Sequence, residues 1–356
     1  MSARIGPGLR VLVGHRRPLV VLLPVSLVVS WTIALVHGPV AVPPPALGIL
    51  AEPLAVLAGS PVWRLLWWLW LAGTLVLIDA VARRYGANEH ARLAAGALLI
   101  ALPVTFWAFG WAGTDGPLAF FGTLALWLAG RVIDGIGSGW SLIVCAAVAG
   151  LFGATAMLAF LVVLALLIAS RPSWRMAGLG VGAMATALVL PVLGVLLGLG
   201  APPATSEPPA GGATLGPLGS AISALNAMVT TGLFTLTQRG IGLPGAPEYF
   251  FQILGWIVIA GVVVAFLRAR VKHLDGPLAV ATAASVVLAG GVLVLVLRAM
   301  SGEWLMLQPI GMAALLPALL ITTATAIRNR PAAWMVTVWS GVVVIVQLVL
   351  AVVATR

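Results

Sequence analysis

Long runs of apolar residues alternate with short polar stretches along the whole chain. Most of these runs are about 20 residues long, the length of helix that crosses the hydrocarbon core of a membrane. The pattern therefore predicts an all-α, polytopic membrane protein with about eleven transmembrane helices, two of them short. The predicted spans lie near residues 18–38, 62–82, 93–111, 117–130, 140–153, 155–170, 176–200, 249–267, 277–299, 305–327 and 333–354.

The apolar run over residues 140–170 is long enough for one tilted helix or for two short ones. Two short helices are favoured, because the positive-inside rule requires Arg131 and Arg171 to lie on the same side of the membrane. The turn between them is expected near residues 150–153. Helices this short need surrounding protein or a thinned bilayer, so they are expected to be re-entrant or partly buried.

Composition and charge support a membrane location. The chain is 62% hydrophobic, only 8% charged and has a mean hydropathy of +1.14, so its apolar surface must face membrane lipid. A net charge of +10 would indicate nucleic acid in a soluble protein, but here the basic residues lie in short clusters between apolar runs. They indicate topology, and no nucleic-acid partner is expected.

The same basic residues orient the chain. With a cytoplasmic N-terminus, about fifteen of the Lys and Arg residues fall inside and four fall outside. The chain has 18 Arg but one Lys, with heavy use of Ala, Gly and Val, which is typical of a high-GC bacterial genome. The prediction is a multi-pass protein of a bacterial plasma membrane.

The chain, residues 1–356, is expected to form a single transmembrane domain with two longer segments outside the membrane. Residues 38–61 are rich in Pro and form the predicted first external loop. Residues 201–248 form the second external segment, and helical spacing of apolar residues over 220–237 predicts a helix lying on the outer surface.

A carboxylate at the mouth of a membrane span is a functional candidate in a chain with so few charges. Asp115 lies at such a mouth, and Glu52 lies in the first external loop. Asp115 stands before Gly116 and Pro117, which is also ordinary chemistry for the start of a helix, so both interpretations remain open. Glu207 lies in a flexible polar linker and is expected to be merely solvated.

Tryptophans cluster at the predicted outer ends of the spans. One interpretation is an interfacial belt, and the other is an aromatic platform for a sugar or a polyprenyl chain. The clustered residues are Trp63, Trp67, Trp68, Trp70, Trp107 and Trp111.

One part of the chain resembles a known family. The passage from Arg64 through Arg83-Arg84-Tyr85-Gly86, Ala94–Pro103 and Thr114-Asp115-Gly-Pro-Leu-Ala-Phe-Phe resembles the N-terminal core of the protein O-mannosyltransferase and aminoarabinose transferase group. These are C-type (GT-C) glycosyltransferases, which take a sugar from a polyprenyl-phosphate donor at the external face of the membrane. The resemblance covers about seventy residues well, and residues 140–170 and 249–320 in outline.

The resemblance implies roles for two carboxylates. Asp115 matches the acid of the second external loop, which helps to organise the donor phosphate or a divalent metal, here Mg²⁺ or Mn²⁺. Glu52 matches the second member of the family's Asp-Glu pair and would act as the catalytic base. The family's Lys after the fifth helix corresponds to Ala156 or Met157, and a late external motif is altered at Leu307-Gln308-Pro309.

Such a reaction displaces the sugar phosphate at its anomeric carbon. A carboxylate takes the proton of the acceptor, and cations offset charge on the leaving phosphate. The residues available to bind the substrate from the external side are Arg64, Trp111, His37, Arg239 and Arg298.

Two other functions remain open. The family departures also fit a noncatalytic GT-C-like assembly subunit for cell-envelope synthesis, acting with envelope-assembly partner proteins. A lipid or solute transporter is the other alternative, because Asp115-Gly-Pro-Leu-Ala119 recurs as Asp275-Gly-Pro-Leu-Ala279, as in an inverted repeat. No acid or Lys is expected near the centre of a span, so a proton-coupled mechanism lacks its usual carriers. The single cysteine, Cys145, is expected to be a small core residue.

Overall fold

The regular structure of the described chain is entirely helical. The structure, a computed structural model, describes residues 17–36, 65–102, 105, 115–153, 155–197, 246–272, 276–299 and 314–353. Within these ranges there are no strands, so the all-α prediction is confirmed. The eleven helices of these ranges are α2 (Arg17–Val36), α5 (Trp68–Arg84), α6 (Glu89–Ala101), α8 (Asp115–Ile133), α9 (Gly139–Phe152), α10 (Ala156–Ser170), α11 (Trp174–Leu196), α13 (Ala246–Lys272), α14 (Gly276–Ala299), α15 (Leu316–Ala326) and α16 (Arg330–Val353).

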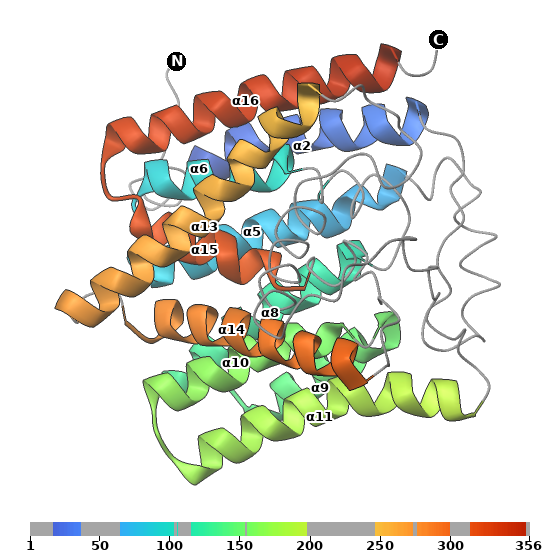
Figure 1. Cartoon of the computed structure of the whole chain (residues 1–356), viewed down its shortest axis with the longest axis vertical. Coiled ribbons are helices and arrows are strands. Elements are labelled where there is room, and N and C mark those ends of the chain that lie inside the picture. Colours follow the sequence, from blue (N-terminus) through green and yellow to red (C-terminus); the bar gives the residue numbers. More distant parts are fainter. Residues whose placement is uncertain are drawn as a thin grey trace, which may run out of the picture.

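The helices lie roughly side by side, with α2 and α16 towards one edge of the bundle and α9 and α11 at the other (Figure 1). Helices that are far apart in the sequence pack together: α16 contacts α6 and α2, and α14 contacts α10. The short helix α15 lies among α13, α6, α5 and α8, and all eleven of its residues are buried. A single large core of buried side chains, including Leu98, Leu99 and Phe160, runs through these packed helices.

In the described part of the chain, four helices, α8, α11, α13 and α16, contain apolar stretches long enough to cross a membrane. Many of the large side chains on the outside of the bundle are also apolar, for example Val20 on α2, Val287 on α14 and Ile345 on α16. Such outward-facing apolar surface is unfavourable in water and is expected where a helix contacts lipid. These features support the predicted membrane protein.

Most helices match the predicted spans, and the differences have local causes. Within the span expected over residues 93–111, α6 ends at Ala101 after 13 residues, and residues 103–104 and 106–111 lie outside the described chain. Leu102 is extended, with φ −67° and ψ 133°, as is favoured for a residue that precedes a proline, here Pro103. Helix α13 begins at Ala246, before the expected residue 249. Of the span expected over 305–327, residues 305–313 lie outside the described chain, and α15 covers Leu316–Ala326.

The structure has two short helices where the sequence predicted them. Helix α9 has 14 residues and α10 has 15, which gives lengths of about 21–22 Å against a hydrocarbon core of about 30 Å. Gly153 separates them with φ 157° and ψ 156°, a conformation that glycine adopts readily because it lacks a Cβ atom. Both helices are partly buried: α9 packs against α8 and α11, and α10 packs against α8, α11 and α14.

Arg131 and Arg171 lie at the same end of the bundle. Helix α8 contains Arg131, and helix α10 ends just before Arg171. The two helices run parallel, because Leu118 of α8 lies 3.8 Å from where a Cβ of Gly153 would be, just before α10, and further along both helices a Cβ atom at Gly122 would lie 3.1 Å from the Cβ of Ala159. Arg131 is in the last turn of α8, and Arg171 directly follows α10. The side of the membrane on which this end lies remains a prediction.

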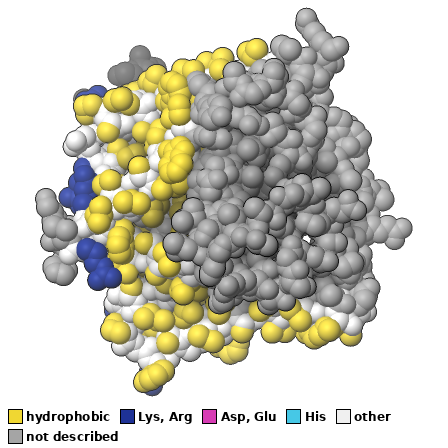
Figure 2. Space-filling model, viewed as in Figure 1, with side chains coloured by type: hydrophobic (Ala, Val, Ile, Leu, Met, Phe, Trp, Pro, Cys, Tyr) yellow, Lys and Arg dark blue, Asp and Glu magenta, His cyan; other side chains and the backbone are white. Residues whose placement is uncertain are grey.

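Every arginine whose side chain is described lies near a helix terminus at this end, which we call the arginine end, and the basic side chains visible in Figure 2 lie along the left edge of the face that it draws. Three hydrogen bonds tie its helix termini together: from Arg84 to Asp134, from Asn88 to the Arg328 carbonyl, and from Arg268 to the Ala326 carbonyl. The arginines concerned are Arg17, Arg83, Arg84, Arg92, Arg131, Arg171, Arg175, Arg268, Arg270, Arg328 and Arg330.

Candidate functional site

The predicted site residues fall at the margins of the described chain. His37, Glu52, Arg64, Trp111 and Arg239 lie outside the described residues, as do the Pro-rich loop over residues 38–61 and the expected surface helix over 220–237. Asp115 and Arg298 belong to helices α8 and α14, at positions where only the backbone is described. The pairing of Glu52 with Asp115 and the metal role of Asp115 therefore stay predictions.

The helix termini nearest in sequence to His37, Arg64 and Asp115 lie close together in space. Helix α2 ends at Val36, just before His37, and the described chain resumes at Leu65, just after Arg64. The indole Nε1 of Trp31 on α2 donates a hydrogen bond to the Leu65 carbonyl at 3.2 Å. The end of α2 therefore meets the beginning of α5.

The beginning of α8, at Asp115, lies at the same end. Trp70 in the first turn of α5 contacts Phe120 in the second turn of α8, with ring centroids 5.3 Å apart. The two helices run parallel, because Arg84 at the other terminus of α5 reaches Asp134 beyond the other terminus of α8. Asp115 thus begins its helix opposite the arginine end, at what we call the distal end.

Helix α14 brings Arg298 to the distal end as well. Thr282, near the start of α14, bonds to Thr322, near the end of α15. Because α15 ends at the arginine end, where the Ala326 carbonyl accepts a hydrogen bond from Arg268, α14 begins at the arginine end and runs away from it. Arg298 is next to its last residue.

An aromatic cluster lies just inside the distal end. Trp70 of α5 contacts Trp67 at 6.1 Å, Phe121 of α8 at 5.8 Å and Phe152 of α9 at 6.1 Å between ring centroids. Phe121 and Phe152 stack at 5.8 Å. The interfacial-belt interpretation is wrong for Trp67, which is only 5% exposed, because it packs inside the bundle. The aromatic side chains pack between the helices that lead to Arg64 and Asp115.

Neighbouring Trp68 also points inward. Its Nε1 donates a hydrogen bond to the Ser26 hydroxyl of α2 at 3.0 Å. Trp63, Trp107 and Trp111, the other members of the predicted cluster, lie outside the described residues. The role of an aromatic platform for the donor thus remains a prediction.

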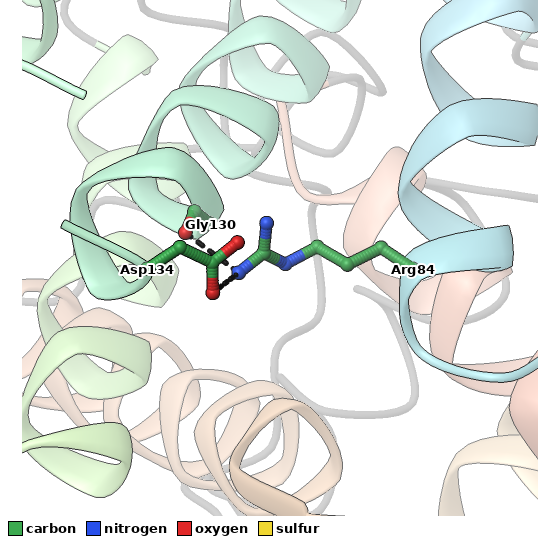
Figure 3. A network of polar contacts seen from close by, with 3 residues as sticks. All are labelled: Arg84, Gly130 and Asp134. Carbon is green, nitrogen blue, oxygen red and sulfur yellow. Dashed lines mark hydrogen bonds and ion pairs between the residues drawn. The ribbon is translucent and has the colours of Figure 1, made fainter. Parts of the chain in front are cut away.

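At the arginine end, Arg84 closes the terminus of α8 (Figure 3). Its Nη2 donates to the Gly130 carbonyl at 2.6 Å and to Asp134 Oδ1 at 2.5 Å. A cation is favourable at a helix C-terminus, where unpaired carbonyls carry partial negative charge. Gly130 permits the approach, because a Cβ atom there would lie 2.8 Å from Arg84 Nε. Beside this pair, burial raises the pKa of Tyr85 above its usual value, although the Arg84 charge opposes the shift.

A second ion pair is buried between α5 and α6. Arg92 Nη1 lies 2.6 Å from Asp79 Oδ1, and the side chains are 6% and 8% exposed. Sequence reasoning missed this pair, since Arg92 was interpreted only as a topology signal and Asp79 was not considered. The positions of the two residues could have indicated the pair, because Asp79 lies five residues before the end of α5 and Arg92 three residues after the start of α6. In an antiparallel hairpin, residues at these positions lie side by side at a similar height along the two helices.

Hydroxyl and amide groups join other helices inside the bundle. The hydroxyls of Thr282 and Thr322 lie 2.9 Å apart, and Thr323 of α15 donates to the Val258 carbonyl of α13 at 3.1 Å. Gln347 of α16 donates to the Ala101 carbonyl of α6 at 2.8 Å. Such interhelical hydrogen bonds hold membrane helices together where the hydrophobic effect cannot.

The described residues offer no metal site of their own. They contain no group of three His, Cys, Asp or Glu side chains that could hold an ion. Cys145 is a buried core residue, as expected, with its Sγ 3.6 Å from the Phe121 carbonyl oxygen. His90 packs against Trp334.

No protein-family model, curated protein or solved structure matches this chain. The assignment of a function therefore depends on the residues and their packing alone.

Proposed function

We propose that the protein is a membrane glycosyltransferase that takes a sugar from a polyprenyl-phosphate donor at the external face of a bacterial plasma membrane. The observation that carries the proposal is the grouping of helix termini. The termini that lead to His37, Arg64, Asp115 and Arg298 share the distal end, while every described arginine side chain lies at the other end.

The charge asymmetry gives the proposal its orientation. Cytoplasmic loops carry an excess of Lys and Arg, so the arginine end would face the cytoplasm and the distal end the exterior. This orientation, with about eleven spans and a cytoplasmic N-terminus, would place Asp115 on the side where polyprenyl-phosphate sugars are used by the enzymes that the chain resembles.

The proposed chemistry assigns one task to each predicted residue. Glu52 takes the proton of the acceptor hydroxyl as that oxygen attacks the anomeric carbon. Arg64, Arg239 and Arg298 offset the negative charge of the departing polyprenyl phosphate, and Trp111 and His37 contact the donor. Asp115 would hold Mg²⁺ or Mn²⁺, which would neutralise charge on the phosphate, or would order the phosphate contacts directly.

Position supports this role for Asp115. It is the first residue of α8, and the aromatic cluster around Phe120 and Phe121 begins one turn further along the same helix. A carboxylate at this place would lie where the polar end of a lipid-linked sugar would meet the apolar bundle. The same position also fits ordinary helix-start chemistry, and the test must separate the two roles.

The test is transfer from a polyprenyl-phosphate sugar in membranes that contain each variant. Asp115→Asn should lower the rate about 10²–10³-fold, since this is the usual cost of removing an electrostatic group aimed at the transition state. Glu207→Gln is the matched control, because it removes one carboxylate from the predicted linker and should leave the rate unchanged. Wild-type activity in Asp115→Asn would leave only a helix-start role for this residue.

One observation favours a noncatalytic assembly subunit as the second candidate. The family's lysine corresponds to Ala156 or Met157. Ala156 is the first residue of α10 and is buried against its neighbours with 1% exposure. Neither residue offers a cation to a phosphate. Wild-type membranes that bind the donor but never transfer the sugar would support this alternative.

A transporter is the third candidate, and it has one structural feature in its favour. The two Asp-Gly-Pro-Leu-Ala segments stand at the starts of α8 and α14, and these two helices begin at opposite ends of the bundle. Their surroundings differ in part, however, because α8 packs against α5, α9, α10 and α15, whereas α14 packs against α10, α13 and α15. An inverted repeat would give the two helices equivalent neighbours. Uptake or release of solute by vesicles that contain the protein would test this candidate.

A further inference from the structure

One corner of the arginine end combines exposed aromatic and basic side chains. It is formed by the turn between α8 and α9, the turn between α10 and α11, and the first turns of α9 and α11. We call it the α9/α11 corner. Its residues are Arg131, Ile136, Trp140, Arg171, Trp174 and Arg175.

The two halves of the corner are neighbours in space. Helices α9 and α11 begin side by side, because a Cβ atom at Gly139 would lie 3.1 Å from Leu179. The helices stay together further along, where a Cβ atom at Gly150 would lie 2.8 Å from the Ala187 carbonyl oxygen. The segment after α8 also folds back, since a Cβ atom at Gly137 would lie 2.9 Å from the Cβ of Arg131.

The apolar side chains of the corner are unusually exposed. Trp174 is 94% exposed, Trp140 is 76% exposed and Ile136 is 71% exposed. The outward faces of the two helices continue this apolar surface away from the corner, through Val144 on α9 and Val181 on α11. Tryptophan favours the interface between headgroups and hydrocarbon, because its ring is apolar and its indole N–H is polar.

The arginines of the corner lack nearby acidic partners. Asp134 is the one acid between residues 116 and 197, and Arg84 of α5 already binds it. Among the described residues, no ion pair joins Arg131, Arg171 or Arg175 to a carboxylate. Arg131 instead lies over the Trp127 ring, 4.9 Å from its centroid. The corner therefore has positive charge to offer to an anion.

We infer that the α9/α11 corner binds the phosphate headgroup of an anionic phospholipid. Arg171 and Arg175 would donate to the phosphate oxygens, while Trp140 and Trp174 lie at the level of the glycerol backbone. The charge is complementary to a phosphodiester, and the surface continues into the outward-facing apolar sides of α9 and α11. This inference is independent of the proposed transferase activity, which concerns the distal end.

A bound lipid at this corner would help the bilayer to match the short helix α9. Helix α9 spans about 21 Å, less than the hydrocarbon core, so the bilayer must thin beside it or its ends must meet the headgroups early. Arginines and tryptophans at its start would hold headgroups at this reduced depth.

The experiment measures retained lipid on the purified full-length protein by native mass spectrometry. The probe is an equimolar mixture of phosphatidylglycerol and phosphatidylcholine in detergent micelles. Wild type should retain phosphatidylglycerol in preference, and R171Q/R175Q should lower that preference about thirtyfold, given the typical contribution of each basic residue near an anionic surface. The control is R83Q/R330Q, which removes the same charge from two exposed arginines elsewhere at the arginine end.

A second readout follows the tryptophans. Brominated phosphatidylglycerol should quench part of the wild-type fluorescence, and W140F/W174F should lose that part. Millimolar inorganic phosphate should not displace the lipid, because the apolar contacts contribute to its binding.

An equal loss of preference in R171Q/R175Q and R83Q/R330Q would show diffuse charge and overturn the inference. So would unchanged retention in both, or displacement by inorganic phosphate. If the wild-type protein were a dimer and R171Q/R175Q made it monomeric while lipid retention stayed unchanged, the corner would instead be an interface between two copies.

Discussion

Arg92 Nη1 lies 2.6 Å from Asp79 Oδ1, and both side chains are almost completely buried between α5 and α6. These helices belong to the passage that resembles the polyprenyl-phosphate glycosyltransferases. The pair joins the two arms of a helical hairpin near the arginine end, so it can hold α5, α6 and the adjoining α15 in register.

Removing either partner of this pair should destabilise the protein strongly. Asp79→Asn or Arg92→Gln leaves one buried charge without its counter-charge, at a cost of about 3–5 kcal/mol. The double variant should cost less than the sum of the two, because it leaves no buried charge. The free energy of unfolding in mixed micelles, titrated with sodium dodecyl sulfate, gives these values.

The control for this cycle is Arg83→Gln, which removes an exposed arginine one turn along α5 from Asp79. It should change the unfolding free energy by less than about 0.5 kcal/mol. Strict additivity of Asp79→Asn and Arg92→Gln would contradict a direct pair.

Gly150→Ala should force α9 and α11 apart. The new Cβ would lie 2.8 Å from the Ala187 carbonyl oxygen, and that backbone atom cannot swing aside as a side chain can. We expect a loss of about 1–3 kcal/mol, measured as above. Gly178→Ala on α11, where nothing lies within 4 Å of the added Cβ, should be neutral or stabilising by up to about 1 kcal/mol. Similar values for the two variants would rule out a close approach at Gly150.

Cysteine labelling should place the turns of the arginine end on one side of the membrane. In a Cys145→Ala background, Ser138→Cys, Ser173→Cys and Asn329→Cys each introduce one thiol at an exposed position of this end. A membrane-impermeant maleimide should modify all three in inverted vesicles and none in intact cells, since the arginine end is expected to be cytoplasmic. Modification of position 173 from the opposite side to position 138 would mean that α9 and α10 do not form a pair of crossings.

Thr322→Val should weaken the contact between α14 and α15. The change removes the hydrogen bond between the Thr282 and Thr322 hydroxyls while keeping nearly the same volume. The expected loss is about 0.6–1.7 kcal/mol, and adding Thr282→Val should cost little more. Thr337→Val is the control, because the Thr337 hydroxyl bonds only the Ala333 carbonyl of its own helix among the described contacts. If Thr337→Val were as harmful as Thr322→Val, the interhelical bond would not be the cause.

The sequence by itself determined where most of the helices lie. In lipid the backbone must satisfy its own hydrogen bonds, so a long apolar run has to be helical, and its length nearly equals the length of the helix. Gly153 marks the break within the apolar run of residues 140–170. Because Arg131 and Arg171 are required to lie on the same side of the membrane, the chain has to cross it an even number of times between them, which calls for two helices there. The end of α6 at Ala101 was not predicted, since the expected span ran on to residue 111, although Pro103 disfavours a helical Leu102.

Only the tertiary structure decided which faces meet. Helix α10 is apolar on all sides, yet Phe160 is fully buried while Ile168 is 43% exposed. Where the surroundings are lipid, an outward face is as apolar as an inward one, so the amphipathic pattern that identifies the buried face of a soluble helix is absent. The Arg84 contact with Asp134, fifty residues away, and the inward packing of Trp67 and Trp70 depend on the choice of neighbours, which apolar periodicity does not encode.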